Sequence, residues 1–225
     1  MTVVALLVVT ILPVAIDRQA LVMRHNVRLD AIDTSSPLTV GNGEFALTAD
    51  VTGLQTLNSS YTSFPPLQTM SHWGWHKVPA ALAGGVNPPS YAYERVTTSG
   101  HTADYATNCT PTPEYNYLRE NPHRINLARI FLRRSNATAI EAGDVTAISQ
   151  ILHLWNGSLA SSFVLDSERV SVDTAVHSAH DVIATRVCSK LVVEGSLSVA
   201  IAFPYATTEF AGGTDWGLPE RHTSR

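Results

Sequence analysis

The sequence is poor in charge and in cysteine, and it lacks the short motifs that identify common catalytic centres. Charged residues make up 15% of the 225 residues, the formal net charge is −4, and there are two cysteines. Because no basic stripe is available to neutralise phosphates, no nucleic-acid partner is expected. There is no HExxH, GxSxG, P-loop or CxxC pattern in the sequence. We therefore predict no catalytic residue, no metal ligand and no cofactor from these motifs.

The first sixteen residues are apolar and carry no charge. This length suits the core of a signal peptide better than a membrane span, which needs about 20 apolar residues. We predict that residues 1–16 are a signal peptide or apolar leader, with Ala15 as the last residue removed, and we expect no stable membrane span. A buried first strand of the mature domain is the alternative, because no Lys or Arg precedes the apolar run.

Four Asn-x-Ser/Thr sequons support a secreted or extracellular protein, since each lies in a turn-like segment where a glycan can stay in solvent. The candidate glycosylation sites are Asn58, Asn108, Asn136 and Asn156. In an oxidising compartment, Cys109 and Cys188 could form a single disulfide. Two separate thiols, with Cys109 exposed and Cys188 buried, are the alternative.

Alternating apolar and polar residues recur in short segments and predict strands. Pro37–Val40 and Glu44–Asp50 flank Gly41-Asn42-Gly43, which favours a tight reversal because Asn and Gly tolerate positive φ. Gly53 is expected to end the following strand. The other predicted strands are Ala20–Leu29, Asn126–Arg133, Ala137–Ala142, Ile148–Trp155, Ser162–Leu165, Arg169–Val176, Val182–Lys190 and Leu197–Phe203.

These strands are separated by turn residues and not by amphipathic helices, which is typical of an antiparallel sandwich. We predict one mainly β domain over residues 17–204, an antiparallel, supersandwich-like β-sandwich with a long irregular excursion from Lys77 to Pro113. Within the excursion we expect a short strand at Tyr91–Thr97, and after it one or two helical turns at Glu114–Glu120. Arg129 and Arg133 fall on one strand face, where we expect them to meet water or acidic neighbours.

The best candidate site is the aromatic run from His72 to His76. Its two tryptophans surround a glycine, a spacing that is unusual in a core strand because glycine weakens the strand. Sugar rings stack their C–H faces on indole, and their hydroxyls need polar partners. We therefore name His72, Trp73, Trp75 and His76 as candidate carbohydrate-binding residues.

Several long stretches carry a resemblance. PLTVGNGEFALTADVTGLQT, TMSHWGWH and YLRENPHRINLARI, with the later runs FPY and DWGLPERHTS, resemble the amino-terminal part of six-hairpin glycosidase-like proteins related to glycoside hydrolase family 65. The resemblance implies a β-sandwich domain followed by an (α/α)6 barrel that carries the catalytic acids. It also implies that residues 205–225 begin a linker to that barrel, and that Asn42, at a hairpin tip, approaches the active-site mouth with the tryptophans.

This resemblance implies a non-catalytic domain of a secreted glycoside hydrolase or glycoside phosphorylase, with carbohydrate and the barrel domain as partners. A free-standing carbohydrate-binding module is the alternative function. For the tryptophans, the alternative role is to fill the interface with the barrel.

Hydrolysis needs two converging carboxylates, and sequence spacing cannot show which acidic residues converge. The available residues are Asp50, Glu94, Asp104, Glu114 and Glu120. His177 and His180 are expected to be exposed and unliganded.

Overall fold

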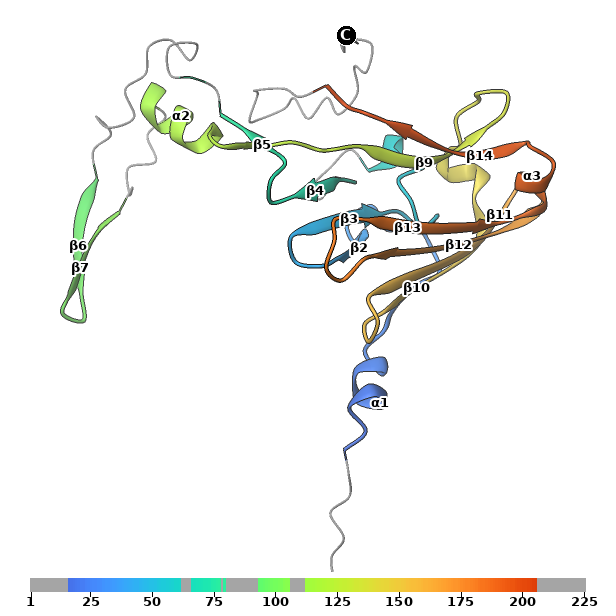
Figure 1. The fold of residues 1–225 in the computed structure, drawn as a ribbon, viewed down its shortest axis with the longest axis horizontal. Coiled ribbons are helices and arrows are strands. Elements are labelled where there is room, and N and C mark those ends of the chain that lie inside the picture. The colour runs from blue at the N-terminus through green and yellow to red at the C-terminus, as the bar shows by residue number, and fades with distance from the viewer. Residues whose placement is uncertain (1–15, 62–65, 78, 80–92, 106–111, 206–225) are drawn as a thin grey trace, which may run out of the picture.

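The computed structural model describes residues 16–61, 66–77, 79, 93–105 and 112–205 (Figure 1). Strands account for 43% of these residues and helices for 15%. Every paired set of strands is antiparallel. The predicted mainly β, antiparallel fold is confirmed.

The largest sheet has five strands in the order β1-β10-β11-β12-β13. Strands β10 to β13 form a meander of consecutive neighbours, and β1 adds the outer edge beside β10. In β11 every second residue is buried, so this sheet presents one face to the core. The strands are β1 (Val27–Leu29), β10 (Thr146–His153), β11 (Ser158–Leu165), β12 (Glu168–Val176) and β13 (Ile183–Cys188).

Shorter strands pack against this face and close the core. A three-stranded sheet has the order β2-β3-β4, and β9 pairs with β14. The buried side chain of Leu47 packs with Leu159 of the large sheet, and Leu132 packs with Phe163. The strands are β2 (Leu38–Gly41), β3 (Phe45–Ala49), β4 (Thr69–Ser71), β9 (Arg129–Arg134) and β14 (Leu197–Ala202).

A buried irregular connection follows β3, where the sequence predicted a strand ending at Gly53. Asp50 organises it: its carboxylate accepts hydrogen bonds from the backbone N–H groups of Thr52 at 2.7 Å and Leu57 at 2.6 Å. Complete burial raises the pKa of Asp50 to about 6, against the opposing effect of these donors. Gln150 donates to the Asp50 carbonyl oxygen at 2.7 Å and so ties the connection to β10. The carboxylate thus replaces the hydrogen bonds that a strand would have supplied.

Smaller elements lie at the periphery. The pair β5 (Trp75–His76) and β8 (His123–Arg124) extends from the core toward α2 (Pro113–Glu120), and β6 (Glu94–Thr98) forms a hairpin with β7 (His101–Tyr105) (Figure 1). Thr112 caps α2, which confirms the helical turns predicted there. None of the helices in the described ranges is long and apolar enough to cross a bilayer.

Three predicted strands differ from the observed elements. Ala20–Leu29 is a strand only at β1, because the Asp17 side chain caps α1 (Arg18–Met23) through the Ala20 N–H. Ala137–Ala142 has no strand; it is irregular and leads into the 3₁₀ turn η3 (Ala142–Asp144). The last predicted residue of Val182–Lys190 begins α3 (Lys190–Val193) behind a Ser189 cap.

Candidate functional site

The first component of the site is the tip of the β2–β3 hairpin, which confirms the predicted reversal. The Asn42 side-chain oxygen accepts hydrogen bonds from the N–H groups of Glu44 at 3.0 Å and Phe45 at 2.8 Å. Gly43 has a φ of +97°, a conformation that disfavours a residue with a side chain. The Asn42 amide nitrogen is thereby directed outward from the turn, as part of an Asx turn.

That amide nitrogen holds the loop that follows β12. It donates to the carbonyl oxygens of His177 at 3.2 Å and His180 at 3.3 Å. Within the loop, His177 Nδ1 accepts from the Ala179 N–H at 3.1 Å, and the two imidazole rings stack with their centroids 4.7 Å apart. One asparagine therefore joins two segments that lie 135 residues apart.

The second component is the Trp-Gly-Trp run. A Cβ atom on Gly74 would lie 2.8 Å from Ser71 Oγ and 2.9 Å from Leu127 Cδ2, so any larger residue would force these side chains to shift. The Gly74 N–H donates to Ser71 Oγ at 2.8 Å. Trp73 and Trp75 on either side are 55% and 50% exposed, so neither is a core residue.

The two components meet through an indole–carboxylate hydrogen bond. Trp73 Nε1 donates to Asp181 Oδ2 at 2.6 Å, and Asp181 belongs to the same loop that Asn42 holds. The His72 imidazole lies 3.9 Å from the Glu44 carboxylate, and the His72 N–H donates to the Glu44 carbonyl oxygen at 2.8 Å. The result is a half-exposed indole bonded to one carboxylate, with the His72–Glu44 pair at the preceding residue.

Trp75 lies on the other side of Gly74, in the short β5–β8 ladder opposite Arg124. Arg124 Nη1 donates to the His72 carbonyl oxygen at 2.6 Å, which connects β8 to the turn that carries Trp73. In the 120–124 segment, Asn121 donates to the Tyr117 carbonyl oxygen and so closes the end of α2. The backbone of His76 pairs with His123; the position of the His76 side chain lies outside the described part of the chain.

The structure thus brings together three of the five predicted residues, Asn42, His72 and Trp73, and places Trp75 and the His76 backbone on the adjoining ladder. Sequence reasoning missed Glu44 and Asp181, and treated His177 and His180 as isolated. The signal was available in the polar run His-Ser-Ala-His-Asp directly after β12. His177 and His180 are exposed as predicted. Within the described ranges, no three acidic, histidine or cysteine residues are grouped to hold a metal ion.

The five acidic residues considered for hydrolysis lie on three separate parts of the fold. Asp50 is buried in the core at 1% exposure. Glu94 and Asp104 lie on the β6–β7 hairpin, where Asp104 is opposite Arg95 and Glu94 is opposite Tyr105, so their side chains project from opposite faces. Glu114 and Glu120 belong to α2.

The predicted modification sites fall in different environments. Asn136 and Asn156 are exposed, Asn58 is partly buried in the 3₁₀ turn η1 (Asn58–Ser60), and Asn108 lies outside the described residues. Cys188, at the end of β13, is exposed and has no disulfide partner among the described residues, where one alternative had placed it in the core. Cys109 also lies outside the described residues, and its pairing with Cys188 stays a prediction.

No protein-family model matches the chain, and no curated protein matches it.

Proposed function

We propose that this chain is the amino-terminal, non-catalytic β-sandwich domain of a secreted glycoside hydrolase or glycoside phosphorylase of the six-hairpin type. Trp73, with Asn42 and His72 beside it, contacts carbohydrate near the mouth of the catalytic (α/α)6 barrel. The long motif resemblance and the antiparallel β fold support the domain assignment. The apolar leader and the four sequons support export.

The observation that carries the proposal is the half-exposed Trp73 ring held by Asp181. An indole whose N–H is bonded at one edge keeps a fixed orientation while its face stays available for stacking. Burial in a hydrophobic core would have covered that face. The nearby His72 and Glu44 side chains are 58% and 72% exposed, so they can reach the hydroxyl groups of a bound sugar.

A second function is favoured by Trp75. It lies on a two-residue ladder at the margin of the fold and is also half-exposed. A large apolar ring at such a margin is typical of a surface that another domain covers. We propose that Trp75 contacts the barrel domain. In a free-standing carbohydrate-binding module, the alternative assignment, both tryptophans would instead contribute to sugar affinity.

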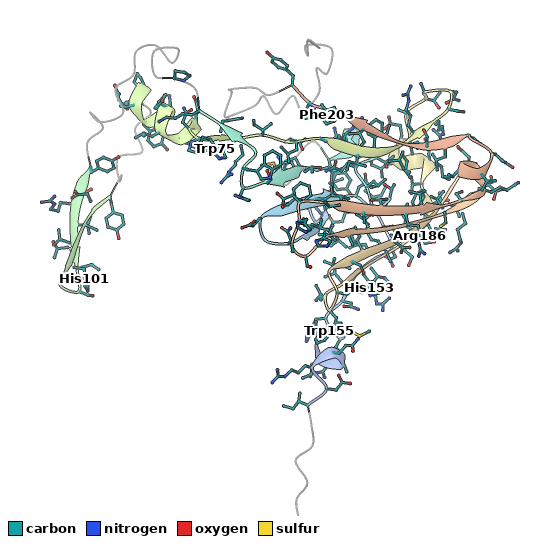
Figure 2. The ribbon with its side chains drawn as sticks, in the orientation of Figure 1. Trp75, His101, His153, Trp155, Arg186 and Phe203 are labelled. Carbon is teal, nitrogen blue, oxygen red and sulfur yellow. The ribbon has the colours of Figure 1, made fainter. Side chains whose placement is uncertain are left out.

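The test uses Trp73→Ala and Trp75→Ala in the 225-residue chain, with Trp155→Ala as the matched control. Trp155 is 51% exposed in the β10–β11 turn, at a well-separated place on the molecule (Figure 2). Binding of α-glucosides and α-fucosides is measured by calorimetry. We expect Trp73→Ala to lower affinity at least tenfold, Trp155→Ala to have no effect, and Trp75→Ala to weaken only association with a separately produced barrel domain.

Three outcomes would contradict these assignments. Equal losses in the Trp73 and Trp155 variants would remove the stacking role. Equal losses of sugar affinity in the Trp73 and Trp75 variants would favour the free-standing module. Hydrolysis of an α-glucoside by the purified chain would overturn the non-catalytic assignment.

A further inference from the structure

A hollow that is separate from the tryptophan site lies beside β9. It has a volume of about 320 Å³ and is bounded by β9, by the turn η1 and by residues 137–141. Its lining combines one apolar ring with charged and amide groups. The side chains that matter here are Asn58, Ser59, Arg129, Phe131, Arg133 and Glu141. We refer to this hollow as the Arg129 groove.

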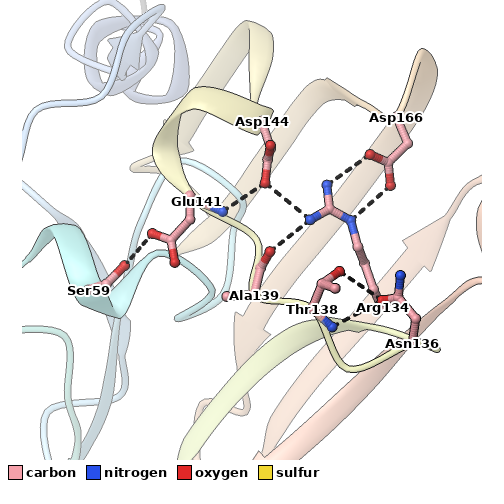
Figure 3. A network of polar contacts seen from close by, with 8 residues as sticks. All are labelled: Ser59, Arg134, Asn136, Thr138, Ala139, Glu141, Asp144 and Asp166. Atoms are coloured by element: carbon pink, nitrogen blue, oxygen red, sulfur yellow. Dashed lines mark hydrogen bonds and ion pairs between the residues drawn. The ribbon is translucent and has the colours of Figure 1, made fainter.

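One wall of the groove is fixed by Arg134, whose guanidinium group joins Ala139, Asp144 and Asp166 in a polar network (Figure 3). Arg134 donates to the Ala139 carbonyl oxygen at 2.7 Å, to Asp144 at 3.1 Å, and to both carboxylate oxygens of Asp166 at 2.8 and 3.0 Å. Ser59 Oγ donates to Glu141 Oε2 at 2.9 Å and connects the wall to η1. The groove is therefore built from groups that already hold one another in place.

Arg129 differs from Arg134 in having no carboxylate partner among the residues that the structure describes. Its Nε atom is buried, and within the described part of the chain it has no hydrogen-bond partner. The guanidinium carbon lies 4.2 Å from the centroid of the Phe131 ring, which supports one face of the group. Burial lowers the pKa of Arg129, but an arginine remains protonated at neutral pH. The expectation that this arginine meets water or an acidic side chain is therefore wrong for its Nε edge.

A buried guanidinium N–H without an acceptor destabilises the free protein, and an oxyanion placed on the guanidinium group offsets part of this cost. The planar edge of arginine matches a carboxylate, with two parallel hydrogen bonds. Glu141 in the same groove carries a negative charge and therefore favours a monoanion over a doubly charged phosphate. Asn58 and Ser59 also line the groove and supply amide and hydroxyl groups for hydrogen bonds to a polyhydroxylated ligand.

We propose that the Arg129 groove binds a sugar-sized hydroxy acid, a hexuronic acid or the uronate end of an oligosaccharide, with its carboxylate on Arg129. The volume lies at the lower end of the range for small-molecule sites and suits one or two sugar rings. The inference stands independently of the tryptophan site, because the two share no residue.

The test measures binding to the full chain by calorimetry, with D-glucuronate as the ligand. D-glucose serves as the uncharged control sugar, and inorganic phosphate serves as the alternative anion. We expect glucuronate to bind at least tenfold more tightly than either. Arg129→Met, which keeps the aliphatic stem, abolishes this binding, whereas Arg169→Gln on β12, outside the groove, and Trp73→Ala leave it within twofold. Phosphate binding as tight as glucuronate binding, or glucuronate binding unchanged in Arg129→Met, would overturn the proposal.

Thermal unfolding without ligand gives a second readout. Because the buried Arg129 Nε–H has no acceptor among the described residues, Arg129→Met should leave the Tm unchanged or raise it, and glucuronate should raise the Tm of the parent chain but not of this variant. A lower Tm for Arg129→Met, together with no glucuronate effect on the parent, would show that Arg129 is a structural residue and would refute the ligand site.

Discussion

Trp73 and Asp181, 108 residues apart in the chain, are joined by a hydrogen bond of 2.6 Å from the indole Nε1 to the carboxylate Oδ2. The bond connects the turn after β4 to the loop after β12. Because Asn42 holds the same loop by two further hydrogen bonds, three loops from distant parts of the sequence converge around one aromatic ring. The orientation of the ring depends on this convergence.

The first prediction follows from that dependence. Replacing Asp181 by Ala removes the acceptor, so the indole gains rotational freedom and a sugar must order it on binding. We expect a loss in carbohydrate affinity of about fivefold, near 1 kcal/mol for one hydrogen bond, with little change in the free energy of unfolding. Asp181→Asn keeps a carbonyl acceptor and should recover most of the affinity. Equal affinities for Asp181→Ala and the parent chain would show that the ring needs no such support.

The second prediction concerns Asn42. Asn42→Ala loses both the turn acceptor and the two donations to the 177–182 loop, so we expect a cost of about 1–3 kcal/mol in urea unfolding. Asn42→Asp retains the acceptor for Glu44 and Phe45 but loses the donors, and its charge faces two carbonyl oxygens. In this variant the Val182 amide, which donates to the His180 carbonyl oxygen at 2.8 Å, should exchange faster with solvent. Unchanged exchange would contradict the role of Asn42 in holding the loop.

The third prediction concerns the sequons. In Asn136 and Asn156 the side-chain oxygen accepts from the hydroxyl two residues later, at 2.7 and 2.8 Å, and both asparagines are exposed. We expect these two sites to be glycosylated more completely than the partly buried Asn58 when the chain is expressed in eukaryotic cells. Asn→Gln at each site, followed by intact-mass measurement with and without endoglycosidase, gives the occupancy. Absence of any glycan mass, with Met1 retained, would show that the chain is not exported.

Local patterning was sufficient to predict much of the fold. The period-2 alternation of β11 and β12 reports a sheet with one buried face, and Asn-Gly determines the β2–β3 reversal through backbone conformation alone. Each of these two signals comes from residues that are close neighbours in the sequence. The helix α1 was missed because its apolar residues also suit a strand, and the Asp17 cap decides between the two.

The candidate site was predictable only in part, because its remaining members are set by long-range contacts. The aromatic run identified Trp73, but nothing near it in the sequence indicates Asp181 as its partner. Arg129 and Arg134 show the same limit. Both are arginines of one strand, yet among the described residues only Arg134 has carboxylate partners: Asp144 comes from η3 and Asp166 from the turn between β11 and β12.

The fourth prediction tests why glycine separates the two tryptophans. Gly74→Ala places a methyl group within 2.8–2.9 Å of Ser71 and Leu127, so we expect a destabilisation of about 1–3 kcal/mol from overpacking. Gly143→Ala is the matched control, because nothing lies within 4 Å of its added Cβ; its effect should stay within about 0.5 kcal/mol. Urea unfolding of the two variants supplies the comparison. Equal stabilities would mean that the turn yields freely around Gly74.

The last prediction is a pH dependence that originates at Asp50. Burial raises the pKa of this carboxyl from 3.8 to about 6 in the folded protein. Between these two values the folded state binds more protons than the unfolded state, so the contribution of Asp50 to stability falls as pH rises from 4 to 6. The difference of about two pKa units corresponds to about 3 kcal/mol.

Asp50→Asn cannot titrate, and its amide would place N–H groups against the Thr52 or Leu57 donors, so it should be destabilised at every pH. The free-energy gap between the parent chain and Asp50→Asn should therefore be larger at pH 4.5 than at pH 7. Urea unfolding of both chains across this range measures the gap. A gap that widens toward pH 7 would mean that the donors around Asp50 outweigh its burial and hold it ionised.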